Sequence, residues 1–144
     1  MNARVMKILR CLFILVCVTG CATMGDVVRS KEQGKGTSKD YRVNVDQAWE
    51  IAKAVFRWEQ TDAVEEHRSE GYMLVSMGES ASSWGVVMGV WIEPVNGEST
   101  RVTVVIKRKN PTDVVVPLTE ADFHEEFELA WRMKAGEPFS PVGR

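Results

Sequence analysis

Two long apolar segments on either side of a tight-turn signal restrict the fold of this chain of 144 residues more than any other feature. The segments WGVVMGVWIEP, 84–94, and STRVTVVIKR, 99–108, flank Asn96-Gly97. Asparagine and glycine tolerate the positive φ that both central positions of a type I′ turn require, so Asn-Gly strongly favours a two-residue hairpin. A turn centred there pairs Trp91 with Val102 and directs Trp91 toward the core. The sequence therefore predicts an antiparallel hairpin within a sheet.

The opposite face of segment 84–94 is also apolar in this register. It presents a row of four side chains, Val86, Met88, Val90 and Ile92. An exposed apolar row often marks a site for a protein partner, so these residues form a predicted partner face. A register shifted by one residue would instead turn the same row into the core, because side chains alternate between the two faces of a strand. Both interpretations remain open from the sequence.

Shorter segments add further strands and two helices. Strands are predicted from alternation in YRVNV, 41–45, and in AVEEHR and YMLVSM, 63–68 and 72–77. Apolar stripes at helical spacing predict a helix in 46–58, with Asp46 as its N-cap, and a second helix that follows Thr119 and ends at Gly136. Thr119 and Asp122 have nearly the spacing of a capping box. Gly85 and Gly89 leave space where a helix approaches the sheet or the sheet bends.

The element order β-α-β-β-β-β-α predicts an α+β fold, a two-layer antiparallel sheet of about five strands with two helices on one face. The order is similar to the TATA-binding-protein-like or helix-grip domains of small periplasmic lipoproteins, including the accessory lipoproteins of the outer-membrane β-barrel assembly machine. This resemblance covers roughly 41–136 and rests on element order. It implies a possible ligand groove between the sheet and the last helix, for which Trp91, Phe127 and Trp131 are the candidate lining residues.

The N-terminus has the pattern of a secretion signal. Three basic residues and no acid occur in MNARVMKILR, and the next eight residues, CLFILVCV, are all apolar. A membrane-spanning helix needs roughly 20 apolar residues, so this run is too short to cross a bilayer. We therefore predict that residues 1–20 are a signal peptide.

The signal ends in VTGC, Val18 to Cys21, which resembles the lipobox of bacterial lipoproteins. The resemblance implies that Val18, Thr19 and Gly20 are recognised by the lipoprotein signal peptidase, and that Cys21 becomes the acylated first residue of the mature chain. Ala22, where inner-membrane lipoproteins carry aspartate, implies sorting to the outer membrane, facing the periplasm, if the organism has two membranes. The alternative is an ordinary secretory signal with a cysteine there by chance.

The polar composition of residues 21–40 predicts a flexible linker, and the lipobox resemblance implies that the first residue of this segment is lipidated. A single α+β domain is expected over 41–136, with a loose tail over 137–144.

Removing the signal leaves 15 basic and 20 acidic residues, so the mature chain lacks the basic surface expected of a nucleic-acid-binding protein. Cys11 and Cys17 leave with the signal, which excludes an internal disulfide and thiol catalysis. His67 and His124 lack metal-ligand spacing and are predicted to be solvated. The serine-rich segment 78–85 lacks a nucleophile elbow and is predicted to be a loop. We expect no metal and no cofactor.

Two functions fit these observations. The first is a non-enzymatic structural or adaptor lipoprotein, anchored in the membrane through Cys21, that contacts another envelope protein. The second is a carrier of a small ligand or lipid. The basic stretch 107–109 is an additional candidate contact for anionic lipid head groups.

Overall fold

The structure, a computed structural model, describes residues 21–81 and 83–134. Five antiparallel strands form one sheet in the order β1-β5-β4-β3-β2. The strands are β1 Thr37–Tyr41, β2 Ala63–His67, β3 Tyr72–Met77, β4 Val86–Asn96 and β5 Ser99–Arg108. The helices are α2 Met24–Glu32, α3 Val45–Trp58 and α4 Glu120–Lys134, with a 3-10 turn at η1 Arg68–Glu70. The predicted α+β class is confirmed, whereas the signal peptide, Gly136 and the tail lie outside the described residues.

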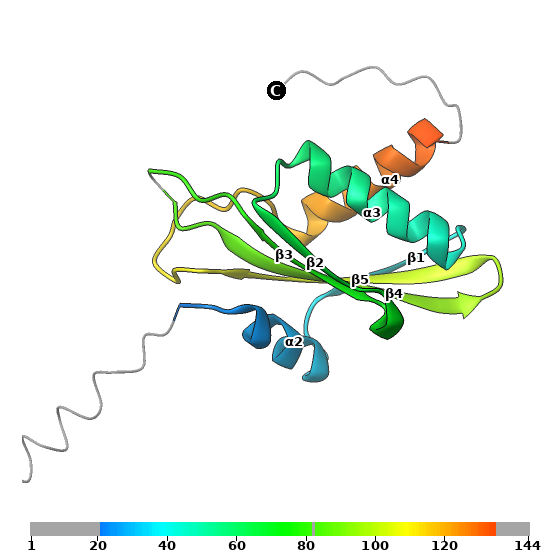
Figure 1. Ribbon diagram of the computed structural model, residues 1–144, viewed down its shortest axis with the longest axis horizontal. Helices are drawn as coiled ribbons and strands as arrows, with labels where there is room; N and C mark the ends of the chain where they lie inside the picture. Colours follow the sequence, from blue (N-terminus) through cyan, green and yellow to red (C-terminus); the bar gives the residue numbers. More distant parts are fainter. Residues whose placement is uncertain (1–20, 82, 135–144) are drawn as a thin grey trace, which may run out of the picture.

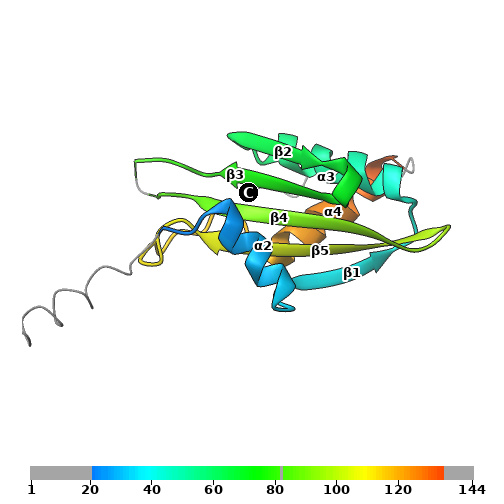
Figure 2. The ribbon, with the colours of Figure 1, turned by 60° about the horizontal axis from the view of Figure 1, so that its bottom comes forward.

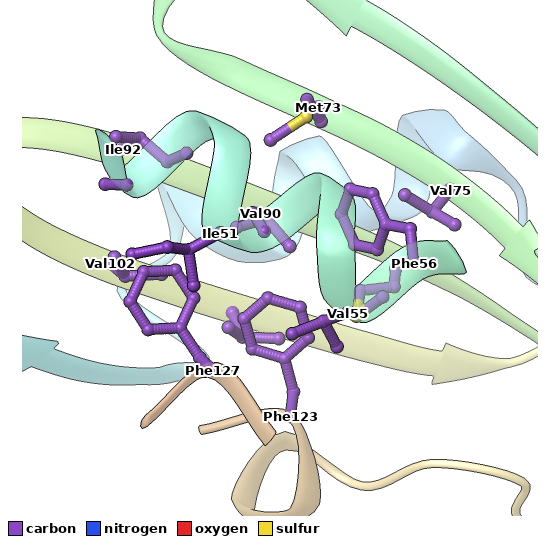
Figure 3. Close-up of a cluster of buried hydrophobic side chains, with 14 of the residues drawn as sticks. Ile51, Val55, Phe56, Met73, Val75, Val90, Ile92, Val102, Phe123 and Phe127 are labelled. Carbon is purple, nitrogen blue, oxygen red and sulfur yellow. The ribbon is translucent and has the colours of Figure 1, made fainter. Parts of the chain in front are cut away.

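Helices α3 and α4 lie on the same face of the sheet, as the sequence predicts (Figure 1). The main core lies between these helices and the sheet (Figure 3). Phe123 and Phe127 of α4 are fully buried there, beside Ile51 and Val55 of α3. Burial of apolar surface at about 25 cal/mol per Å² is the main stabilising contribution at such a helix–sheet contact.

Helix α2 covers part of the other face of the sheet, and this element was not predicted (Figure 2). Val27 of α2 is fully buried in a second apolar cluster, together with Leu74, Val87, Trp91 and Val105. At Gly89 an added Cβ would come within 2.7 Å of a Val27 methyl carbon, so glycine is what allows α2 to pack here. The prediction that residues 21–40 form a flexible linker is therefore wrong.

The first strand also differs from its predicted position. It covers Thr37–Tyr41 instead of 41–45, because the chain is already turning toward α3 after Tyr41. The hydroxyl of Thr100 donates to the carbonyl of Val43 at 2.7 Å, beyond the end of β1. Asn44, rather than Asp46, caps α3: its side chain accepts from the Gln47 amide at 2.8 Å, and Gln47 accepts in return from the Asn44 amide.

The pairing of β4 with β5 contains an irregularity that changes the predicted register. Asn96 pairs with Ser99, whereas Pro94 pairs with Thr100, so Val95 is an extra residue in β4. Trp91 consequently lies opposite Thr103 instead of Val102. A bulge of this kind shifts the register beyond it by one residue. The residues of β5 that face the main core are the predicted ones, whereas in β4 the residues predicted to face away from the core are the ones that face it.

The N-terminus of α4 is as predicted. The amide of Asp122 donates to Thr119 Oγ1 at 3.2 Å, and the amide of Thr119 donates to the Asp122 carboxylate at 2.9 Å. Leu118 and Phe123 are both buried against the core, in the positions of a hydrophobic staple. This capping box fixes where α4 begins.

Candidate functional site

Cys21 is exposed at one end of the sheet. The amide of the next residue, Ala22, donates to the carbonyl of Lys109 at 3.1 Å, just beyond the end of β5. The amide of Lys109 in turn donates to the carbonyl of Gly85 at 3.0 Å, just before β4 begins. The residue directly after Cys21 is therefore already joined to the sheet by a backbone hydrogen bond.

Helix α2 starts immediately after this bond. Thr23 caps the helix: its side chain accepts from the Asp26 amide at 3.3 Å, and its own amide donates to the Asp26 carboxylate at 2.8 Å. The Asp26 carboxylate also accepts from the Thr23 hydroxyl at 2.8 Å, and the two hydrogen bonds that Thr23 donates to it hold the pKa of Asp26 below its ordinary value. The capping box of Thr23, two residues after Cys21, fixes where α2 begins. Val18, Thr19 and Gly20, the predicted peptidase recognition residues, lie outside the described residues.

The predicted partner face is wrong. Its four residues, Val86, Met88, Val90 and Ile92, are buried beneath α3 and α4 in the main core. The bulge at Val95 accounts for this, because a shift of one residue exchanges the two faces of a strand. The row is therefore a structural element of the core and cannot contact a partner.

The predicted ligand groove is also wrong, because its three residues do not lie on the same side of the sheet. Trp91 lies on the face covered by α2, where its ring stacks against Tyr72 at a centroid distance of 5.7 Å. Phe127 is fully buried on the opposite face, and Trp131 packs against the same core. The sheet itself separates Trp91 from the other two.

Three hollows on the surface lie elsewhere. One of about 640 Å³ is lined by Arg42–Asn44, Gln47 and the β4–β5 turn, at the end of the sheet away from Cys21 (Figure 1). A second, of about 390 Å³, is lined by Glu79–Ala81, Ser83, Trp84 and Asp113, at the same end as Cys21. A third, of about 280 Å³, lies on α4 beside Glu125 and Arg132. None of these three is an apolar groove beneath α4.

His124 is buried, and the prediction that it is solvated is wrong. Its Nε2 atom lies 3.1 Å from the carbonyl of Thr37, and its Nδ1 atom lies 2.9 Å from the hydroxyl of Tyr41. A carbonyl only accepts, so Nε2 carries the proton and Nδ1 accepts from the tyrosine. Burial lowers the pKa of His124 and raises that of Tyr41. This network joins β1 to α4, and it was missed because Tyr41 and Thr37 are distant from His124 in the sequence.

His67 lies at the end of β2 and is half-buried. Its ring stacks on Tyr72 at a centroid distance of 4.5 Å. Among residues 21–81 and 83–134, no group of three or more histidine, cysteine, aspartate or glutamate side chains is placed to hold a metal ion. In the same part of the chain, no helix has the length and apolar character needed to span a bilayer.

Comparison with known proteins finds no family model and no curated protein that matches this chain. Among solved structures, it is similar to an uncharacterised protein from Bacillus thuringiensis, with a TM-score of 0.39 and 9% identity over 68% of this chain and 93% of that one. It is also similar to the Zhui aromatase/cyclase from Streptomyces sp. R1128, with a TM-score of 0.28 and 13% identity over 71% of this chain and 86% of the other. At these TM-scores neither likeness transfers a ligand or an activity.

Proposed function

We propose that this chain is an exported envelope lipoprotein, acylated at Cys21, which holds its α+β domain at a membrane as a non-enzymatic adaptor for another envelope protein. The observation that carries the proposal is the position of Cys21, the last residue of VTGC. Its side chain is exposed, and the next residue, Ala22, makes a backbone hydrogen bond to Lys109 of the folded domain. A thiol in this position is open to acylation without any rearrangement of the sheet.

Acylation would supply enough binding energy for lasting attachment. Each methylene group buried in the bilayer contributes about 0.8 kcal/mol, and one acyl chain alone gives only marginal binding. A diacylglycerol on the thiol, with a further chain on the new amino group, would make attachment effectively permanent. The chain would then need no membrane-spanning helix.

An adaptor needs a surface for its partner, and the buried row on β4 cannot provide one. The hollow of about 640 Å³ is a better candidate, because the β4–β5 turn that lines it lies at the opposite end of the sheet from the start of α2 (Figure 1). Its lining is polar and includes Arg42, Asn44, Gln47 and Glu98. Such a surface suits a partner that binds through hydrogen bonds. The carrier alternative has no comparable support, because its predicted groove is divided by the sheet.

The anchor is tested by following processing of the full chain in a bacterium. The Cys21→Ala variant is expected to lose metabolic labelling with palmitate and to accumulate as precursor. Cys17→Ala is the matched control: it removes a thiol from the signal, and the lipobox resemblance predicts normal labelling and cleavage. Cleavage and release of Cys21→Ala as efficient as that of the wild type would contradict the proposal.

The adaptor role is tested by photo-crosslinking in intact cells. A crosslinking amino acid at Glu98, in the β4–β5 turn, should capture one protein of constant mass. The same amino acid at Lys35, exposed on the turn between α2 and β1, is the control and should not capture it. Capture of the same proteins from both positions, or of none from Glu98, would count against a specific partner at this end.

A further inference from the structure

The end of the sheet that carries Cys21 also carries two loops. Residues 78–85 connect β3 to β4, and residues 109–117 follow β5 (Figures 1 and 2). The hydrogen bonds of Lys109 with Ala22 and Gly85 join the segment after β5 to both the N-terminus and the first loop. All three segments therefore lie side by side, at the point where a lipid on Cys21 would enter the bilayer.

Three apolar side chains project from these loops, and together they are named the apolar tip: Trp84, Val114 and Val115. Within the part of the chain that the structure describes, they are the three most exposed large hydrophobic side chains, at 63%, 92% and 56%. Single exposed apolar residues are common on protein surfaces, whereas a group of them gathered at one place marks a contact site. The apolar tip is therefore a candidate contact site.

Asp113 holds the two loops in place. Its carboxylate accepts hydrogen bonds from the Trp84 amide at 2.7 Å and from the Ser83 hydroxyl at 3.1 Å. Its carbonyl accepts from the Arg108 guanidinium at 3.0 Å. Trp84 and Val114 are thus presented by a bonded loop pair, which reduces the entropy that would be lost when they bind.

The charges around the apolar tip balance. Lys109 forms an ion pair with Glu79, Arg108 bonds the Asp113 backbone, and Lys107 lies near Asp26. The acidic side chains of Glu79, Asp26 and Asp113 lie among these basic residues and offset their charge, so attraction to anionic head groups is not expected to be the main contribution to the contact. Tryptophan has an apolar ring with one polar N–H group and prefers the boundary between head groups and acyl chains. This chemistry fits the surface of a lipid bilayer.

The missing linker strengthens this assignment. A chain spans at most about 3.6 Å per residue, and only Cys21 separates the predicted lipid from the bonded Ala22 amide. The domain therefore cannot hang away from the membrane as a linker over 21–40 would allow. Some part of it must touch the bilayer, and the apolar tip is the part beside the anchor.

We propose that Trp84, Val114 and Val115 insert into the bilayer interface beside acylated Cys21, so that the domain stands on the membrane with its β4–β5 turn pointing away. This inference rests on the proposed function, because it requires the lipid on Cys21. The apolar tip sets the orientation of the anchored domain, which fixes the end of the sheet that a partner can reach.

The test uses the full lipoprotein, purified in detergent from bacterial membranes and reconstituted in phosphatidylcholine vesicles. A nitroxide is attached at Val114→Cys, or at the matched control Val95→Cys, an exposed valine near the β4–β5 turn. The acylated Cys21 is blocked and the signal cysteines are gone, so each variant carries one free thiol. Intact mass, measured on the same sample before labelling, reports whether Cys21 is acylated.

We expect an acylated chain in which the oxygen-to-nickel accessibility ratio of the label at 114 exceeds that at 95 severalfold, because apolar oxygen partitions into the bilayer whereas the polar nickel chelate stays in water. Equal ratios in an acylated chain would overturn the membrane contact and leave the anchor intact. A mass without acyl chains would overturn the proposed function, and with it the inference.

Discussion

The amide of Ala22 donates a hydrogen bond to the carbonyl of Lys109 across 3.1 Å, which ties the residue after Cys21 to the end of β5. A lipid attached at Cys21 would thereby be coupled to the sheet with no intervening linker. The orientation of the domain on a membrane then becomes a property of the fold. The predictions that follow test the parts of the structure on which this coupling depends.

Helix α2 is expected to contribute to the stability of the domain. Val27 is fully buried between α2 and the sheet, so Val27→Ala should lower the free energy of unfolding by about 1 to 3 kcal/mol through lost burial and a residual cavity. Glu32→Ala, on the exposed side of the same helix, is the control and should change it by less than about 0.5 kcal/mol. Urea unfolding measures both. Equal effects would mean that α2 is a linker after all.

Gly89 is expected to tolerate no side chain. A Cβ there would lie 2.4 Å from the Trp91 ring and 2.7 Å from Val27, and neither can move without disturbing the α2 contact. Gly89→Ala should therefore destabilise the domain by about 1 to 3 kcal/mol, the usual cost of overpacking. Gly97→Ala is the control, since nothing lies within 4 Å of its added Cβ. Thermal unfolding that ranks the two variants the other way would contradict the packing of α2 on β4.

Asp113 is expected to order the loop that carries Trp84. In Asp113→Ala the Trp84 amide loses its acceptor, so its hydrogen exchange should accelerate at least about tenfold, which corresponds to about 1.4 kcal/mol. The Glu98 amide, bonded to Asn96 at the far end of the sheet, is an internal control and should not change. If the Trp84 amide exchanges at the wild-type rate, Asp113 does not hold the apolar tip.

Stability is expected to fall as pH falls below about 6.5, the ordinary pKa of histidine. Burial is the main cause that lowers the pKa of His124 in the folded state, with Lys39 of β1 acting in the same direction and the Thr37 carbonyl and Glu120 of α4 opposing it. As the pH falls, His124 therefore takes up a proton at a higher pH in the unfolded chain than in the folded one. The stability that neutral His124 contributes is complete above its pKa in the unfolded chain, and it is lost as the pH falls toward its pKa in the folded chain.

Urea midpoints at pH 7.5, 6.5 and 5.5 measure this dependence. His124→Gln should reduce the change in the urea midpoint with pH, because glutamine at this position cannot titrate. Carboxylates whose pKa is lowered in the folded state, such as Asp26 and Glu128, stay ionised over this range and should not contribute. An unchanged dependence of the midpoint on pH in His124→Gln would show that another group titrates.

Local signals in the sequence predicted local structure well. The capping box of α4 was found because Thr119 and Asp122 satisfy each other within one helical turn. The faces of β5 were also right, because Arg101 and Thr103 alternate with buried valines. In each case the deciding interactions lie within a few residues of sequence.

Errors arose where the deciding contact was distant or the pattern was uniform. Every residue from Val86 to Ile92 is apolar or glycine, so alternation could not show which face of β4 is buried, and the bulge at Val95 decided it. Helix α2 was missed because a mostly polar segment needs only Val27 and a few neighbours to pack on the sheet. The burial of His124 depends on Tyr41 and Thr37, on a strand that was predicted too late in the chain.

The central claim is that Cys21 carries the membrane anchor, and the mass of the N-terminal peptide of the natural protein tests it most directly. The protein is extracted from membranes, digested, and its first peptide is measured. The account predicts a peptide that starts at Cys21 and carries a diacylglyceryl thioether. A peptide that starts before Cys21, or one that starts at Cys21 with a free thiol, would contradict it.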